Sequence, residues 1–182
     1  MTEVEFKIGD LAVYPAQGVA EIVGIETRRI GALQEIFYTL RILDSEKKIM
    51  IPVKKVGSVG LRRVVSRPEA EDLVALMAGR MERADAHETW NRRYRRYLEK
   101  IKSGQAPEVA EVFRDLSVIK IGKELSFGER KMLDMARTLL VKELAIALGI
   151  DETAMEARLD ELFGPDPAEA DGEAAAGPGP GD

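Results

Sequence analysis

The first third of the chain alternates short apolar runs with glycine and proline, which is the pattern of β-strands. Five runs rich in valine, isoleucine, phenylalanine and tyrosine occupy residues 6–15, 18–29, 35–44, 47–53 and 60–65. The sequence Asp-Ser-Glu-Lys at 44–47 is typical of a hairpin turn. Five short strands in about sixty residues predict a small, strongly bent β barrel.

From Ser66 the apolar residues recur every three or four positions, which predicts helices. Ser66 and Glu69 have the spacing of a capping box, and the helix that they open is predicted to end near Gly79. A second helix is predicted to follow Asp85, with Glu88 at capping-box spacing, and to end at Gly104. Three further helices are predicted to begin near Pro107, Ser126 and Asp151, the last of them ending at Phe163.

These patterns divide the chain into three parts. Residues 1–66 are expected to form a β domain and residues 67–164 an all-helical domain of about five helices, which makes the fold class α+β. Residues 165–182 consist almost entirely of proline, glycine, alanine and acidic residues. Because such a segment has too little apolar surface to offset the entropy of ordering, we expect a disordered acidic tail.

The composition excludes several classes of chemistry. The chain has no cysteine and a single histidine, His87, so disulfides, cysteine-based zinc sites and multi-histidine metal sites are excluded. There is no glycine-rich phosphate loop, and His87 is expected to be an exposed residue in the first turn of the second helix. We therefore expect a protein without cofactor or metal that is not an enzyme. An enzyme of unknown class would require a pocket with converging polar groups.

Neither a membrane segment nor a signal peptide is indicated by the sequence. No apolar run approaches the ~20 residues that span a bilayer, and the N-terminus MTEVEFKIGD lacks the regions of a signal peptide. A cytoplasmic protein is expected.

The charge is unevenly distributed. The net charge of −5 and the pI of about 5.2 argue against nucleic-acid binding at first sight. However, residues 151–182 hold ten of the 32 acidic residues and one of the 27 basic ones, which leaves 26 bases against 22 acids in the remainder. The sharpest excess lies at 90–102, where only Glu99 opposes six bases: Arg92, Arg93, Arg95, Arg96, Lys100 and Lys102. A basic surface for DNA is therefore compatible with an acidic protein.

The same stretch contains the only tryptophan, Trp90. Helical spacing places five apolar residues on one stripe: Trp90, Tyr94, Tyr97, Leu98 and Ile101. An ordinary amphipathic helix with solvated arginines would give this pattern. Yet an aromatic residue in the first turn, next to backbone N–H groups and arginines, also suits a wedge against an unstacked base step. A second basic pair, Arg130 and Lys131, is either part of such a DNA-binding surface or merely solvated.

Six motifs together resemble the CarD/CdnL family of bacterial RNA polymerase-binding transcription regulators. They are IGDLAVYPAQGVAEI at 8–22, IETR at 25–28, IMIPV at 49–53, WNRRYRRYLEKIKSG at 90–104, VAEVFRDL at 109–116 and LSFGERKMLDMARTLLVKEL at 125–144. The resemblance runs from about Phe6 to Phe163, and the last three motifs in this order are highly specific. The first motif also resembles the polymerase-interacting module of transcription-repair coupling factors. The helical half and the absence of helicase motifs distinguish this chain from those ATPases.

The resemblance implies a Tudor-like β domain that binds the RNA polymerase β subunit and a helical domain that meets the upstream edge of the transcription bubble. The positions implied for polymerase contact are Arg28, Leu40, Met50 and Pro52. Trp90 falls on the family's minor-groove tryptophan, and Arg92, Arg93, Arg95 and Arg130 fall on DNA-facing positions. Where some members have a basic residue two before the proline, this chain has Met50, which implies an apolar contact in place of an ion pair.

The expected function is a regulator that stabilises the open promoter complex with low sequence specificity. We expect a monomer that associates with the nucleoid through RNA polymerase. The alternative is a protein–protein adaptor of the transcription machinery, in which the helical domain binds another protein and its basic residues are only solvated.

Overall fold

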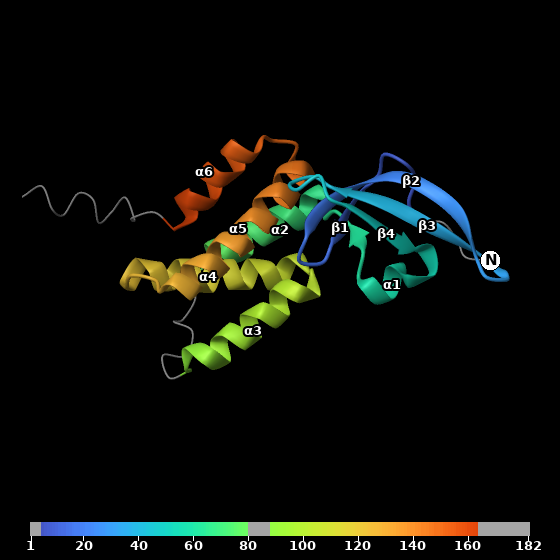
Figure 1. Ribbon diagram of the computed structural model, residues 1–182. Coiled ribbons are helices and arrows are strands. Elements are labelled where there is room, and N and C mark those ends of the chain that lie inside the picture. Colours follow the sequence, from blue (N-terminus) through green and yellow to red (C-terminus); the bar gives the residue numbers. More distant parts are fainter. Residues whose placement is uncertain (1–4, 80–87, 164–182) are drawn as a thin grey trace, which may run out of the picture.

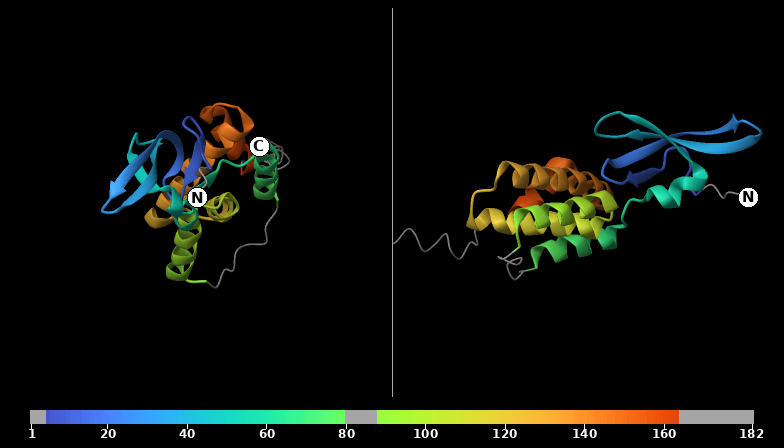
Figure 2. Two further views of the ribbon diagram at one scale, coloured as in Figure 1. Left: turned by 90° about the vertical axis from the view of Figure 1, so that its right-hand side faces the viewer. Right: turned by 60° about the horizontal axis from the view of Figure 1, so that its bottom comes forward.

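A computed structural model of the chain describes residues 5–79 and 88–163 (Figure 1). His87, Asp85 and the predicted tail at 165–182 lie outside these residues. A twisted sheet packs at one end of a bundle of helices, and the β2–β3 hairpin projects away from that bundle (Figures 1 and 2). The α+β fold class predicted from the sequence is confirmed.

Five antiparallel strands form the sheet, in agreement with the prediction. They are β1 (Leu11–Tyr14), β2 (Gly18–Ile30), β3 (Leu33–Ile42), β4 (Lys48–Pro52) and β5 (Arg62–Arg63), in the spatial order β4-β3-β2-β1-β5. The predicted turn at 44–47 joins β3 to β4. Within the described part of the chain β4 and β5 do not pair, so the sheet is open and is not a closed barrel. A 3₁₀ turn (Val53–Lys55) and the short helix α1 (Val56–Val59) connect them.

Alternation of side chains across the sheet creates its hydrophobic core. Phe6, Ile22, Tyr38 and Leu40 have no exposed surface. The rings of Phe6 and Tyr38 meet edge to face at 5.9 Å, and the Phe6 N–H donates a hydrogen bond to the Tyr38 hydroxyl at 3.0 Å. This core is separate from the larger one among the helices.

A β-bulge interrupts the alternation in β2. Ile22 pairs with Leu40 and Gly24 pairs with Thr39, so two steps along β2 correspond to one step along β3. Even-numbered residues of β2 therefore face the core before the bulge, and odd-numbered residues face it after the bulge. Ile22 points into the core before the bulge, whereas Arg28, also at an even position, is exposed after it.

Five longer helices form the remainder of the described chain. They are α2 (Arg67–Ala78), α3 (Trp90–Ser103), α4 (Ala106–Gly122), α5 (Phe127–Leu148) and α6 (Glu152–Leu162). The capping boxes predicted at Ser66 and Ser126 are both present. None of these helices is long and apolar enough to cross a membrane.

The predicted start of the second helix was wrong. α3 begins at Trp90 with Thr89 as its N-cap, so Glu88 lies before the helix and not within its first turn. Thr89 has extended backbone angles, φ −64° and ψ 147°, and its carbonyl accepts the first backbone hydrogen bonds, from Arg92 and Arg93. Trp90 consequently occupies the first helical position.

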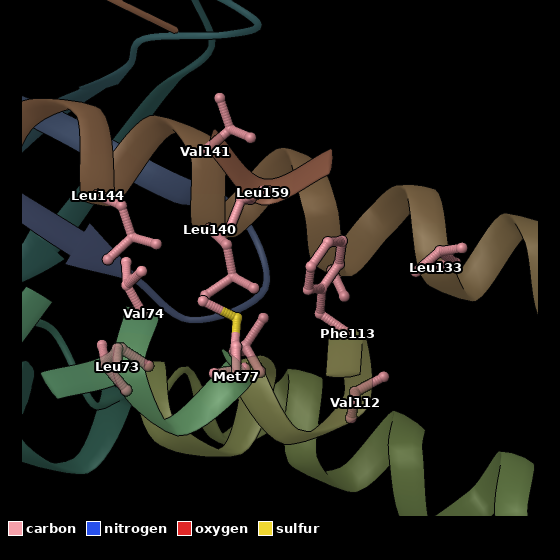
Figure 3. Close-up of a cluster of buried hydrophobic side chains, with 14 of the residues drawn as sticks. Leu73, Val74, Met77, Val112, Phe113, Leu133, Leu140, Val141, Leu144 and Leu159 are labelled. Carbon is pink, nitrogen blue, oxygen red and sulfur yellow. The ribbon is translucent and has the colours of Figure 1, made fainter. Parts of the chain in front are cut away.

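The core of the bundle lies along α5, the longest helix. Figure 3 shows Leu140 and Leu144 of α5 directed towards Val74 and Met77 of α2, with Phe113 of α4 beside them. Each such side chain contributes about 1.5–3 kcal/mol on full burial. α5 thereby holds α2, α4 and α6 in fixed positions.

Candidate functional surfaces

The aromatic stripe of α3 is divided between core and surface. Tyr97 and Ile101 are buried, Leu98 is half-buried and Tyr94 is exposed. Trp90 is half-buried, and its ring packs edge to face on Tyr94 at 5.5 Å. The C-terminal half of α3 is therefore anchored in the bundle, while its N-terminal half presents aromatic side chains at the surface.

Trp90 also lies against the first turn of α5. A Cβ atom on Gly128 would be 3.1 Å from Trp90 Cζ2, so a larger residue at position 128 would displace the indole. This contact places the N-terminal ends of α3 and α5 next to each other. The positive dipole ends of two helices thus meet beside one tryptophan.

Phe127 is a residue of this surface that the sequence analysis missed. It precedes Gly128 and is 77% exposed, the highest exposure among the large apolar side chains of the described residues. In the sequence it reads as part of a capping box. The available signal was a large apolar residue at the first helical position, where no core contact requires one.

The predicted basic residues fall into two groups. Arg92, Arg95 and Lys131 are exposed, and so is Arg130, whose guanidinium lies 3.6 Å from the Glu124 carboxylate. We call the set Trp90, Tyr94, Phe127, Arg92, Arg95, Arg130 and Lys131 the aromatic–basic surface. These four cations are exposed, and the Arg130–Glu124 pair is itself so exposed that it contributes little to stability.

Arg93 differs from the other arginines of α3. Its side chain is 12% exposed and donates a hydrogen bond to Glu129 at 2.9 Å. Its guanidinium also stacks over the Trp90 ring at 5.5 Å. The charge of Arg93 is already engaged by the buried carboxylate of Glu129 on α5. Arg93 therefore holds the Trp90 ring against α5.

Glu129 connects Arg93 to the cap of α5. Burial raises the pKa of its carboxyl, but hydrogen bonds from the Ser126 N–H and hydroxyl and the nearby Lys123 outweigh that effect, so the pKa lies below its ordinary value. A carboxylate with a lowered pKa stabilises the fold above its unfolded pKa, and that contribution is lost as the pH falls through the folded pKa.

We expect Glu129→Gln to cost about 1–3 kcal/mol at pH 7, since Arg93 loses a charged partner. Glutamine does not titrate, so the difference from the wild type should shrink at pH 3. Urea unfolding of both proteins at the two pH values measures this. A difference that is equal at pH 7 and pH 3 would show that Glu129 is not the titrating group.

Three of the four predicted polymerase-contact residues lie on one face of the sheet. Met50 pairs with Thr39, Pro52 pairs with Phe37, and Arg28 pairs with Glu35 further along β3. These positions on β3 are two residues apart and so share a side. We call the surface of Arg28, Met50 and Pro52 the outer β face.

The outer β face includes the free edge of β4. Met50 is 39% exposed, and Pro52, which has no N–H, is at an edge strand, where proline is tolerated. Arg28 pairs with Glu26 at 3.1 Å, but both side chains are about half exposed, so this pair contributes little to stability. Arg28 is therefore available for another partner.

Leu40 does not belong to this face. It pairs with Ile49 and Ile22, has no exposed surface and points into the sheet core. Alternation along β3 places it on the side opposite to Thr39 and Met50. Its place among polymerase-contact residues is corrected to a packing position beneath the face.

No group of three or more acidic, histidine or cysteine side chains within the described ranges is arranged to hold a metal ion. One surface hollow of the bundle is lined by Lys120, Lys123 and Arg130, among other residues.

Comparisons with known proteins match both halves of the chain. The family described as CarD-like/TRCF RID domain matches residues 6–65, and the family described as CarD, C-terminal domain, matches residues 73–160. A Bacillus subtilis (strain 168) protein named "Putative transcription factor YdeB" is 35% identical over 147 residues, which cover 81% of this chain and 95% of that protein. A solved structure, "CdnLNt from Myxoccoccus xanthus", is 53% identical with a TM-score of 0.30 and covers 35% of this chain and 90% of its own.

The RID match lies on the residues that form the sheet, and the C-terminal match covers most of the helices. The relative from B. subtilis spans both. The chain therefore belongs to the CarD/CdnL family of transcription regulators that interact with RNA polymerase.

Proposed function

We propose that this chain docks on the β subunit of RNA polymerase through the outer β face and stabilises the open promoter complex through the aromatic–basic surface. The DNA contact is in the minor groove at the upstream edge of the transcription bubble. The observation that carries the proposal is the position of Trp90. It is half-buried between the N-termini of α3 and α5, with the Arg93 guanidinium over its ring, and the first turns of these two helices also carry the exposed Arg92, Arg130 and Lys131.

The chemistry of the aromatic–basic surface suits a partly melted duplex. Aromatic side chains stack on unpaired bases or insert between base steps, and arginine and lysine contact the phosphates on either side. These contacts read backbone and shape rather than a base code, so sequence specificity is low. Because an unstacked step is available only in melted DNA, the surface favours the open state over the closed one.

Docking on polymerase compensates for weak intrinsic DNA affinity. A few phosphate contacts give weak, salt-dependent binding in isolation. Tethering by the outer β face raises the effective concentration of the aromatic–basic surface at the promoter. The free edge of β4 adds main-chain groups that are able to pair with a strand of a partner protein.

The alternative is a protein adaptor, for which the exposed Phe127 and Tyr94 would be a contact for another protein. A photo-crosslinking residue at Asn91, exposed in the first turn of α3, separates the two functions. In a complex of full-length chain, polymerase and promoter DNA, we expect crosslinks to DNA near the upstream edge of the bubble. The matched control is the same residue at Glu156, exposed on α6, which lies on the far side of the bundle from α3 (Figure 1). Crosslinks from position 91 to protein alone would favour the adaptor.

A further inference from the structure

α3 carries Trp90 at its first residue and contacts the sheet at its other end. Gly104, which caps the helix, accepts a hydrogen bond through its carbonyl from Arg62 Nε of β5 at 2.9 Å. A Cβ atom on Gly104 would lie 2.9 Å from Pro15 Cα, in the turn between β1 and β2, and the φ of +71° also favours glycine. The end of α3 is therefore packed directly against two segments of the β half.

The same guanidinium extends to α5. Arg62 forms two hydrogen bonds with the Glu143 carboxylate, at 2.6 and 2.9 Å, and the Glu143 side chain is 6% exposed. Glu143 also accepts a hydrogen bond from the Val65 N–H at 3.1 Å. A two-pronged, charge-assisted pair of this kind fixes orientation as well as distance.

Two further contacts support this junction on α5. Lys142 pairs with Asp44, in the turn between β3 and β4, at 2.9 Å. A Cβ atom on Gly18 of β2 would be in van der Waals contact with Leu139. Because α5 also contacts Trp90 through Gly128, both helices that hold the indole are themselves held by the sheet.

We propose that Arg62 is a positioning residue that fixes the orientation of Trp90, the proposed DNA wedge, relative to the outer β face. Arg62 holds α3 through the Gly104 carbonyl and α5 through the Glu143 carboxylate. Docking of the sheet on polymerase would therefore determine where Trp90 meets DNA. This inference rests on the proposed function. α3 has 14 residues and is about 21 Å long at ~1.5 Å per residue, so a 10° tilt at its base would move Trp90 by about 4 Å. Such a displacement exceeds what a stacking contact tolerates.

The absence of cysteine permits a direct test in the full-length chain. Cysteines introduced at the exposed positions Ser58 and Glu99 take spin labels, and the width of the distance distribution between them reports the rigidity of the junction. With Arg62→Ala we expect a broader distribution and polymerase affinity within about twofold of the wild type. The open-complex lifetime should shorten by about three- to tenfold, as for other mutations that weaken coupling.

The matched control is Arg137→Ala. It removes a two-pronged pair of the same kind, with Asp160, that joins α5 to α6 within the bundle. Because Asp160 is mostly exposed, this variant should change the melting temperature little, and it should leave the distance distribution and the open-complex lifetime unchanged. Arg62→Lys keeps the positive charge but cannot form the two parallel hydrogen bonds to Glu143, so the distance distribution should broaden to an intermediate extent. This variant replaces Arg62→Ala in the test if Arg62→Ala does not fold.

An unchanged distance distribution in both Arg62 variants would overturn the inference, and so would a broadened one with a wild-type lifetime. Failure of the proposed function is recognised separately. If Trp90→Ala has a wild-type open-complex lifetime, the wedge is wrong, and the distance distribution still decides whether Arg62 fixes the junction.

Discussion

Met50→Asp is expected to abolish detectable binding of the chain to RNA polymerase. Met50 lies on the edge strand β4, beside Pro52 and on the same side of the sheet as Arg28. In the docked state its apolar side chain would be covered, and an aspartate there would be buried without a partner. A loss of about 3 kcal/mol corresponds to roughly a hundredfold weaker affinity.

The fold should tolerate this change, since the Met50 side chain is already 39% exposed. Met135→Asp is the matched control, because Met135 is 37% exposed and lies on α5 and not on the outer β face. Affinity for polymerase is measured by titration without DNA, alongside thermal unfolding of each variant. A folded Met50→Asp protein that binds like the wild type would remove the outer β face from the proposal.

Trp90→Ala is expected to shorten the lifetime of the open promoter complex by about tenfold, with little change in affinity for polymerase. One stacking contact is worth about 1–3 kcal/mol, and ~1.4 kcal/mol corresponds to a factor of ten. Because Trp90 is half-buried, the loss of folding stability should be below the about 3–5 kcal/mol of a buried aromatic residue. The measurement is dissociation of preformed open complexes after addition of competitor.

Phe127→Ala distinguishes surface chemistry from structural damage. Its side chain is mostly exposed, so its removal should leave thermal unfolding unchanged while shortening the open-complex lifetime by a smaller factor than Trp90→Ala. A Trp90→Ala protein that folds normally and preserves wild-type open complexes would exclude the wedge. A variant that unfolds early would instead assign Trp90 to the packing of α3 against α5.

Local sequence rules predicted the elements well because caps and turns depend on neighbouring residues. The Ser66 and Ser126 capping boxes are examples, and the five strand segments were predicted from the turn residues between short apolar runs. Rules of this kind failed at the start of α3, where Glu88 has the spacing of a cap partner but Thr89 is the N-cap. Thr89 is followed three residues later by Arg92 and not by a glutamate or glutamine, so it has no capping-box pattern, and only the fold shows that the helix begins there.

The surfaces were harder to predict than the elements, because they depend on long-range pairing. Arg93 resembles its neighbouring arginines in sequence, and its engagement by Glu129, 36 residues away, decides its role. Leu40 was assigned to a contact face without knowledge of the strand register, and that register places it in the core. Arg62 and Glu143 are separated by 81 residues, so no local pattern connects them.

The bulge in β2 determines which of the later residues of that strand face outward, so the number of residues after the bulge matters. Deleting Val23 would remove the bulge and leave Gly24 opposite Thr39, whereas deleting a residue after the bulge, such as Glu26, would move Arg28 to the position opposite Ile36, where it would face the core. Before the bulge the even-numbered Ile22 faces the core, and after it the even-numbered Arg28 faces outward. The single extra residue Val23 causes this change. Homologous chains should therefore vary freely in length at the Gly31–Ala32 turn but not between Gly24 and Arg28, even where their residue types differ.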